Sequence, residues 1–226
     1  MPVFEFEFDW GVHTMMRLLD SYEFDTVLDV GSGSGGHTRF LRHFGKQVFT
    51  ADLHRSADYA GDFVRIEFDR RFDVVWCSHV LEHQRNVGAF LEKIYDCLAD
   101  DGLLAITVPT HPRERLISGH VTSWNAGLLC YNLILAGFDC HQARLLKTYE
   151  LGLIVRKAAA RGPDIRSAAA YGKVEALAQF FQFPIEDGGN ADIAEANWGE
   201  REYDLPPALE AGPIHVKSKF ADIRFE

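Results

Sequence analysis

The chain has 226 residues, of which 47% are hydrophobic, and this is enough for one α/β domain with a full core and some extension. Its formal net charge of −10 argues against a general binder of nucleic acids or anionic membranes, because such binding needs a basic surface. The N-terminal residues lack the pattern of a secretory signal, and no apolar run is long enough to cross a membrane, so we expect no membrane span.

The first half of the chain is predicted to alternate strands and helices around a glycine-rich turn. Phe4–Phe8 alternates apolar and acidic residues, which fits either an edge strand or a loop flap. The next predicted elements are a helix over Gly11–Asp20, a strand over Phe24–Val30, a helix over Gly36–Phe44, a strand over Gln47–Ala51 and a truncated third strand over Asp58–Gly61. That third strand is short because too few residues precede it for a full crossover helix.

The second half is predicted to complete a doubly wound sheet. Phe72–Ser78 is a nearly continuous apolar run, which is typical of a buried parallel strand. The elements expected after it are a helix over Val87–Leu98, a strand over Leu103–Val108, a helix over Asn125–Ala136 and two tightly joined strands, Phe138–Lys147 and Leu151–Lys157. This order predicts an α/β fold with a mostly parallel seven-stranded sheet that ends in an antiparallel hairpin.

The most informative motif couples an apolar strand to a glycine loop through an acidic residue, Asp29. Glycines at 31, 33, 35 and 36 allow sharp turns and a close approach to a ligand, and three of them also match the dinucleotide fingerprint. Asp29 decides between the two interpretations, because a carboxylate at the strand end would repel a pyrophosphate and suits a positively charged ligand. S-adenosylmethionine has no phosphate and carries ammonium and sulfonium cations. Asp52 ends the second strand at the distance where a ribose diol would be bound.

With these residues the chain resembles the class I S-adenosylmethionine-dependent methyltransferases, whose first motif is an acid followed by Gly-x-Gly-x-Gly. The resemblance covers roughly residues 24–157 and implies a Rossmann-like fold with S-adenosylmethionine as the cofactor. It also implies that Asp52 accepts hydrogen bonds from the ribose, that Asp62 accepts one from the adenine amine and that Phe63 packs on the adenine ring. The full set of implied cofactor contacts is Asp29, Gly31, Ser32, Gly33, Gly35, Asp52, Leu53, Asp62, Phe63 and Cys77.

Three histidines, His79, His111 and His120, follow the fourth and fifth strands, on the side where the methyl group should point, and are the candidate catalytic residues. A general base is needed only when the methyl acceptor is a weakly acidic hydroxyl or a protonated amine that must lose its proton. Histidine suits that task near neutral pH. His120 is favoured because Trp124 follows it closely and could hold an acceptor ring. Each histidine could instead be a packing residue, as could His83 in its Leu-Glu-His turn. No metal site is expected, because the histidines lack HxH or HExxH spacing.

We expect residues 1–157 to form the S-adenosylmethionine-binding domain with an N-terminal flap, in which Trp10 and His13 could cover the cofactor. Residues 158–226 are expected to form an extension packed on or capping that domain, with a helix over Ser167–Phe181 and a strand or ordered arm at Ile214–Lys217. Three roles remain open for this extension: a lid, a substrate clamp, or a dimer contact that would produce a homodimer. The four cysteines are scattered without a CxxC pair and are predicted to be reduced core thiols, which favours a cytoplasmic protein.

The sequence therefore predicts a methyltransferase that acts on a small molecule or a saccharide, by O-methylation, with RNA and DNA disfavoured as acceptors by the acidic composition. One alternative is an NAD(P)-dependent oxidoreductase that uses Gly31, Gly33 and Gly36, although a Tyr-x-x-x-Lys pair is not evident. The other is a non-catalytic scaffold subunit of the same fold that works through residues 158–226.

Overall fold

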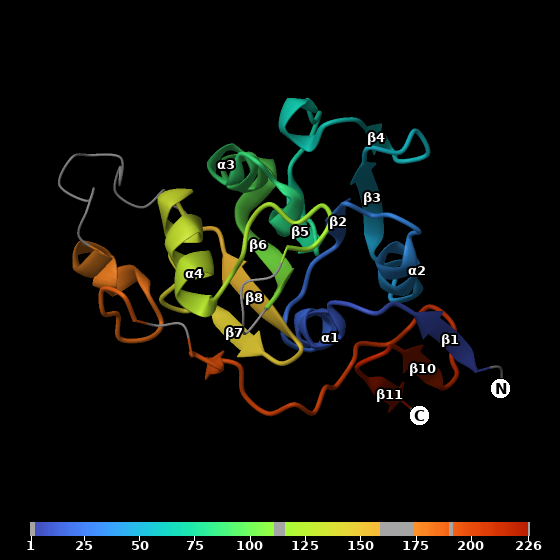
Figure 1. Cartoon of the computed structure of the whole chain (residues 1–226). Helices are drawn as coiled ribbons and strands as arrows, with labels where there is room; N and C mark the ends of the chain where they lie inside the picture. Colours follow the sequence, from blue (N-terminus) through green and yellow to red (C-terminus); the bar gives the residue numbers. More distant parts are fainter. Residues whose placement is uncertain (1–2, 111–115, 159–173, 190–191, 226) are drawn as a thin grey trace.

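The computed structural model describes residues 3–110, 116–158, 174–189 and 192–225, which form a large sheet with helices on both faces and a small second sheet (Figure 1). The large sheet has the strand order β4-β3-β2-β5-β6-β8-β7-β9, in which the first five strands are mutually parallel. Its strands are β2 (Thr26–Val30), β3 (Gln47–Asp52), β4 (Tyr59–Ala60), β5 (Phe72–Ser78), β6 (Leu98–Pro109), β7 (Arg144–Lys147), β8 (Glu150–Arg156) and β9 (Glu195–Ala196).

The helices cover both faces because successive side chains of each buried strand point to opposite sides. Val74 and Trp76 of β5 pack under α1 (Val12–Ser21) and α2 (Gly36–His43), whereas Val75 and Cys77 pack under α3 (Val87–Cys97) and α4 (Ala126–Leu135). Short 3₁₀ turns complete the connections: η1 (Phe63–Arg65), η2 (Leu81–His83) and η3 (Val174–Phe180). Within the described ranges, no helix is long and apolar enough to cross a membrane.

The sequence-based strand prediction is confirmed in type and order, with differences at the ends. All seven predicted strands are present, and the truncated third strand is β4, which pairs parallel with the end of β3. The strand predicted from Phe138 begins only at Arg144, because the chain first turns at Cys140, whose carbonyl accepts a hydrogen bond from Ala143 N at 2.9 Å. An eighth strand, β9, comes from the C-terminal segment and pairs antiparallel with β7.

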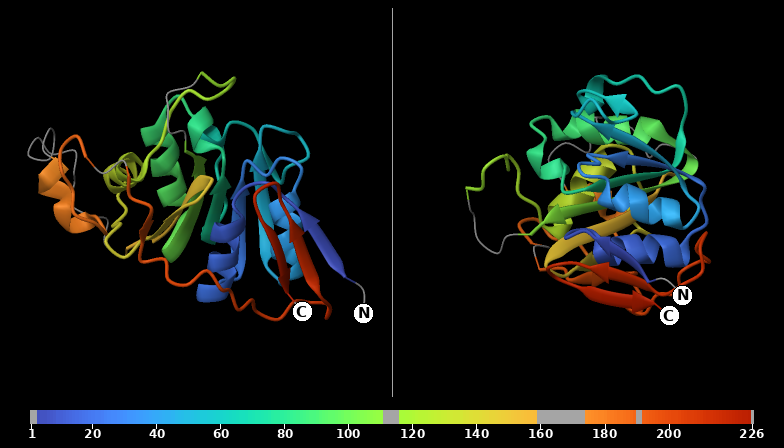
Figure 2. Two further views of the ribbon diagram at one scale, coloured as in Figure 1. Left: turned by 60° about the horizontal axis from the view of Figure 1, so that its bottom comes forward. Right: turned by 90° about the vertical axis from the view of Figure 1, so that its right-hand side faces the viewer.

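Both ends of the chain meet in the small sheet (Figure 2). There β10 (Ile214–Lys217) pairs parallel with β1 (Phe4–Glu7) and antiparallel with β11 (Asp222–Phe225). The edge-strand interpretation of Phe4–Phe8 is therefore confirmed. Its apolar side packs on α2, where the rings of Phe6 and Phe40 meet edge to face with centroids 5.0 Å apart.

The described part of residues 158–226 also contributes to both cores. Phe181 and Phe183 are buried beside α4, and Ile214 and Val216 are buried against the α1 and α2 side. Trp198 is 1% exposed, and the Arg17 guanidinium of α1 lies 5.8 Å from its ring centroid. Residues 167–173 of the predicted helix lie outside the described residues. The division at residue 157 stays a prediction, because packing against a domain does not show whether that domain folds alone.

The burial of Trp198 yields a test of how much the C-terminal segment stabilises the fold. We expect Trp198→Ala to lower the free energy of unfolding by about 3–5 kcal/mol, because it removes a large ring and leaves a cavity. Urea denaturation followed by circular dichroism measures this. The control is Glu202→Ala, an exposed position in the same segment, which should stay within about 0.5 kcal/mol of the wild type. Equal stabilities of the two variants would contradict the packing role of Trp198.

Candidate functional site

A tight turn joins β2 to α2 and brings backbone close to the site. Gly31, Gly33 and Gly35 all have positive φ, of 74°, 51° and 76°, which only glycine adopts at little cost. At Gly31 an added Cβ would lie 2.3 Å from Val80 Cγ2, so a side chain there would collide with the loop that follows β5. Ser32 lies in the same turn, half-buried. The glycines therefore allow the two loops to approach each other.

Asp52 at the end of β3 fastens this turn to the neighbouring strand. Its Oδ2 accepts a hydrogen bond from Gly33 N at 2.9 Å, and its Oδ1 accepts one from His54 N at 3.0 Å. An ionised carboxylate has about four acceptor positions, so two hydroxyl donors could still be accommodated. Asp52 is thus held in place by the backbone and retains the capacity to bind a diol.

A cavity of about 490 Å³ opens at the carboxyl ends of β2, β3 and β5. The strand order reverses direction here, since β3 and β4 lie on one side of β2 while β5 and β6 lie on the other, and ligands of open α/β sheets bind at such points. Its volume is within the usual range for ligand pockets. The residues that line it are Val30, Gly31, Ala51, Asp52, Leu53, Gly61, Asp62, Phe63, His79, Val80, His83, Gln84 and Phe90.

Five of the predicted cofactor residues therefore share this cavity: Gly31, Asp52, Leu53, Asp62 and Phe63. The ring of Phe63 is fixed against Phe90, with centroids 5.0 Å apart. Asp62 caps η1, where one of its oxygens accepts a hydrogen bond from Val64 N at 3.3 Å. The carboxyl group of Asp62 and the ring of Phe63 are thus neighbours at the start of one short turn.

Asp29 and Cys77 do not line this cavity. Asp29 is 1% exposed, points toward α2 and accepts a 2.6 Å hydrogen bond from Thr38 Oγ1. Burial, partly offset by this hydrogen bond, raises the pKa of Asp29 to about 6. Strand alternation places Asp29 on the opposite side of the sheet from Phe63 and Phe90, so it fixes the start of α2 behind the pocket. Cys77 is fully buried in the core cluster that also contains Phe90, and its contact with the cofactor stays a prediction.

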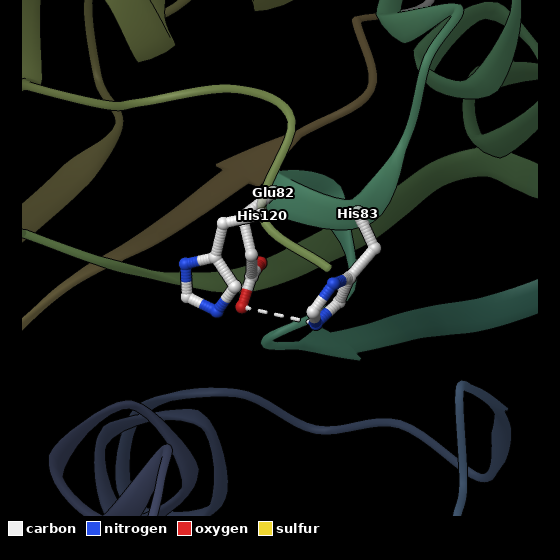
Figure 3. A group of neighbouring side chains, drawn as sticks. All are labelled: Glu82, His83 and His120. Carbon is white, nitrogen blue, oxygen red and sulfur yellow. Dashed lines mark ion pairs between the residues drawn. The ribbon is translucent and has the colours of Figure 1, made fainter. Parts of the chain in front are cut away.

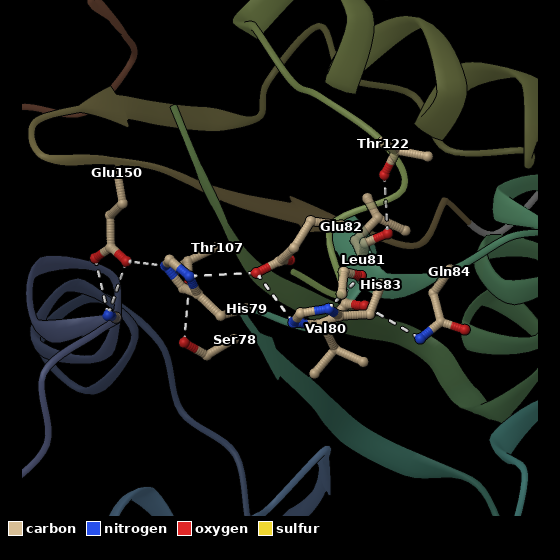
Figure 4. A network of polar contacts seen from close by, with 12 residues as sticks. Ser78, His79, Val80, Leu81, Glu82, His83, Gln84, Thr107, Thr122 and Glu150 are labelled. Atoms are coloured by element: carbon tan, nitrogen blue, oxygen red, sulfur yellow. Dashed lines mark hydrogen bonds and ion pairs between the residues drawn. The ribbon is translucent and has the colours of Figure 1, made fainter. Parts of the chain in front are cut away.

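His79 lies between two buried carboxylates (Figure 4). Its Nε2 is 2.9 Å from Glu150 Oε2, and its Nδ1 is 3.3 Å from Glu82 Oε1. Burial opposes protonation of the ring, but the two carboxylates outweigh it and raise the pKa of His79 above the usual range. His79 also has a φ of 54°, rare outside glycine, which indicates that its surroundings hold it in this conformation.

This arrangement does not suit His79 for the general-base role predicted from sequence. A base needs a ring nitrogen that can receive a proton from a substrate, and here both nitrogens face carboxylates within the protein. His79 is better described as a charged anchor for the loop after β5.

The N-terminal segment contacts His79, one of the residues that line the cavity, and its role as a flap over the cofactor stays a prediction. Trp10 stacks on the His79 ring with centroids 4.3 Å apart, and Gly11 N donates to both oxygens of Glu150 at 2.8 and 3.1 Å. An added Cβ at Gly11 would lie 2.6 Å from Trp76 Cζ2, so glycine permits this approach. His13, the other residue of the predicted flap, contacts Tyr203 Oη at 3.0 Å instead.

His120 lies on the loop before α4 and meets the turn that carries Glu82 and His83 (Figure 3). The rings of His83 and His120 are perpendicular, with centroids 5.0 Å apart. Trp124 is 7% exposed and packs in the core beside α4, so it does not offer the acceptor platform that was expected. His111 lies outside the described residues.

Sequence reasoning missed Glu82 and Glu150. Each is a single acid within an apolar stretch, Val-Leu-Glu-His and Tyr-Glu-Leu-Gly-Leu, and a charge inside such a run is a signal because an ionised group is seldom buried without a partner. The partner of Glu150 could not be identified from spacing, because His79 and Glu150 are far apart in the chain.

The profile of the family described as "Methyltransferase domain" matches residues 12–154, which is more than half of the chain and includes the glycine turn, the cavity and the His79 network. Among curated proteins, the chain is 26% identical over 94 residues to a malonyl-[acyl-carrier protein] O-methyltransferase of Calditerrivibrio nitroreducens. That alignment covers 38% of this chain and 38% of the relative, so the chain matches well under half of the relative's length.

Two solved structures show the same fold. One is the 1,6-didemethyltoxoflavin-N1-methyltransferase of Burkholderia thailandensis with bound 1,6-didemethyltoxoflavin and S-adenosylhomocysteine, which has a TM-score of 0.55, 20% identity, and covers 66% of this chain and 79% of its own. The other is an S-adenosylmethionine-dependent methyltransferase of Clostridium acetobutylicum, with a TM-score of 0.50, 11% identity, and coverage of 66% and 91%. At these identities the likeness establishes the Rossmann-like fold.

The raised pKa of Asp29 predicts a pH dependence of stability in the ligand-free protein. In the unfolded chain this group releases its proton near pH 3.9, whereas in the folded protein it does so only at about pH 6. The folded state therefore binds more protons across that window, and stability falls as pH rises through it. Between pH 4 and pH 7, the free energy of unfolding of the wild type should fall by about 2–3 kcal/mol relative to that of Asp29→Asn.

Urea unfolding of both proteins at several pH values measures this difference. Asp187→Asn is the control, because it replaces an exposed acid. The difference in the free energy of unfolding between this variant and the wild type should be the same at every pH. If the difference in the free energy of unfolding between Asp29→Asn and the wild type were also constant with pH, burial would not raise the pKa of Asp29 as described.

Proposed function

The chain belongs to the class I S-adenosylmethionine-dependent methyltransferase family, and from this membership we propose that it methylates a hydroxyl oxygen of a small molecule or saccharide. One observation carries the proposal. A single cavity is lined by groups suited to a nucleoside, Asp52 and Phe63, and also by the imidazoles of His79 and His83. We propose that a methyl donor bound by the first two residues presents its reactive group toward these imidazoles.

The residues present fit S-adenosylmethionine. Asp52 has acceptor capacity left for the two ribose hydroxyls, and Asp62 and Phe63 form an acid and a ring for the adenine. Gly31 lets backbone approach the ligand where a Cβ would collide with Val80. Leu53 is 79% exposed at the rim, and a bound nucleoside would cover it. We propose these five residues as direct contacts, with Ser32, Gly33 and Gly35 shaping the turn and Asp29 fixing it from behind.

S-adenosylmethionine supplies an electrophilic methyl group when bound, and the protein must align an acceptor with it and exclude water. A hydroxyl acceptor also has to lose its proton. His79 has both nitrogens engaged, so the imidazoles that we propose for handling that proton are His83, which lines the cavity, and His120, whose ring centroid lies 5.0 Å from that of His83. Their presence beside the cavity is the reason to favour a hydroxyl over an amine that is already neutral.

The two alternatives drawn from the sequence are set aside. The family matched by the chain is a methyltransferase family and not one of oxidoreductases or scaffold subunits. The names of its relatives include both O- and N-methyltransferases, so the acceptor atom is part of the proposal. The homodimer, the cytoplasmic location and the absence of a nucleic-acid acceptor stay predictions.

The ribose role of Asp52 is tested by Asp52→Ala. We expect calorimetry to show a loss of about 1.5–3 kcal/mol in binding of S-adenosylmethionine and of its demethylated product, because hydrogen bonds to a charged group are removed. Asp187→Ala, which removes an exposed acid elsewhere, should bind as the wild type does. Unchanged affinity in Asp52→Ala would move the ribose contact to another residue. Tight binding of NAD in place of S-adenosylmethionine would overturn the cofactor assignment.

Acceptor chemistry is tested by label transfer. Purified protein is incubated with methyl-labelled S-adenosylmethionine and panels of phenols, saccharides and amines, and the products are separated by mass. We expect label on hydroxyl compounds, and a much lower rate with Asp52→Ala at subsaturating cofactor. Label found only on amines would show that the acceptor atom is nitrogen.

A further inference from the structure

Glu82, His83 and His120 form a compact cluster that the cofactor contacts do not use. One ligand atom from each side chain lies within 4.8 Å of the other two, and the three come from η2 and from the loop before α4 (Figure 3). His83 also lines the cofactor cavity, so the cluster opens toward the place where an acceptor would bind.

Glu82 is the residue that most requires an explanation. Its side chain is 1% exposed, and the ion-pair partners that face its carboxylate within the described residues are histidine nitrogens. The nearest groups of opposite potential charge are His79 Nδ1 at 3.3 Å and His83 Nε2 at 3.8 Å. A buried carboxylate is costly unless positive charge compensates it, and the one ring of His79 is shared between Glu82 and Glu150.

The orientation of His83 suits a ligand of a cation. Its Nδ1 lies 2.8 Å from the carbonyl oxygen of Gly119, which can only accept, so Nδ1 carries the proton. In the uncharged ring the Nε2 lone pair then faces Glu82. A metal-bound histidine commonly donates its other ring N–H to a carbonyl in this way.

The loop that carries His120 is tied to the turn that carries the other two groups. Val121 N and Thr122 N both donate to the carbonyl oxygen of Glu82, at 2.8 and 3.2 Å, and Thr122 Oγ1 donates to that of Leu81 at 3.3 Å (Figure 4). These bonds fix the position of His120 relative to Glu82 through the backbone, so the cluster does not depend on a chance meeting of side chains.

We propose that Glu82, His83 and His120 bind a divalent transition-metal ion. Two imidazoles and one carboxylate are a common ligand set for Zn²⁺, Fe²⁺ and related ions, and three protein ligands leave at least one position open. Metal–ligand bonds of about 2.0–2.2 Å place ligand atoms roughly 3.4 Å apart, so binding would shorten the separations between these atoms, now within 4.8 Å, by at most about 1.4 Å. The site was not expected from the sequence because its members lack a local motif.

The role of this ion rests on the proposed methyl transfer. An acceptor hydroxyl coordinated at the open position becomes more acidic, because the cation stabilises the alkoxide. Its O–H bond breaks with the proton passing to solvent, an O–C bond to the methyl group forms, and the C–S bond breaks with its electron pair remaining on sulfur. With their lone pairs on the metal, His83 and His120 would orient this ion and would not themselves take the proton.

Binding is tested on chelator-treated full-length protein without cofactor or acceptor. Calorimetry with Zn²⁺, Mn²⁺ and Co²⁺ should show one site, and the Co²⁺ complex should give visible absorption bands. His83→Ala and His120→Ala should each weaken binding at least tenfold, whereas His141→Ala, which removes an exposed histidine elsewhere, should not. Circular dichroism confirms folding of each variant. Glu82→Gln is a further variant that keeps the shape and removes the charge. Absent binding, or equal affinity in every variant, would overturn the site.

The catalytic role is tested separately from the site. Chelation should suppress methyl transfer, readdition of metal should restore it, and the affinity for S-adenosylmethionine should not change. If the metal binds at this cluster but chelation leaves transfer unaffected, the catalytic role is wrong and proton handling by histidine is favoured. If no acceptor is methylated under any condition, the proposed function fails while the metal-binding result still decides the site.

Discussion

The site depends on the buried ion pair between His79 and Glu150. The carboxylate also accepts the N–H of Gly11, so one side chain at the start of β8 connects the N-terminal helix with the loop after β5. Removing either partner would leave an uncompensated buried charge, which is among the costliest changes in a protein core. The pair therefore explains how His79 is held in a left-handed conformation, with Trp10 stacked on its ring.

A second consequence concerns the charge of this region. Two carboxylates, of Glu82 and Glu150, flank a single imidazole, and a protonated His79 compensates only one of them. The interior beside the cavity is thus suited to positive charge. The cationic methyl donor and a divalent ion both satisfy that requirement, and a dinucleotide pyrophosphate does not. The glycine turn supplies shape, whereas these buried acids supply the electrostatic preference.

The fold was largely predictable from the sequence because its signals are local. Strand β5 has the predicted bounds, Phe72–Ser78, since a nearly continuous apolar run is what a strand buried on both faces requires. Asn125 caps α4 through a 2.8 Å hydrogen bond to Leu128 N, in agreement with the predicted start of that helix. The prediction failed for the start of β7, where an apolar stretch turns at Cys140, and for β9, whose two residues carry no periodic pattern.

The sequence by itself determined the glycine turn, the acid that ends β3 and the acid–aromatic pair at Asp62 and Phe63, because each lies beside the element that positions it. Only the tertiary structure decided that Asp29 lies behind the pocket, that His79 has no nitrogen to spare and that Glu82 and His83 meet His120. The physical reason is that these outcomes depend on which face of a strand a side chain takes and on contacts between segments distant in the chain. Neither is encoded in the spacing of neighbouring residues.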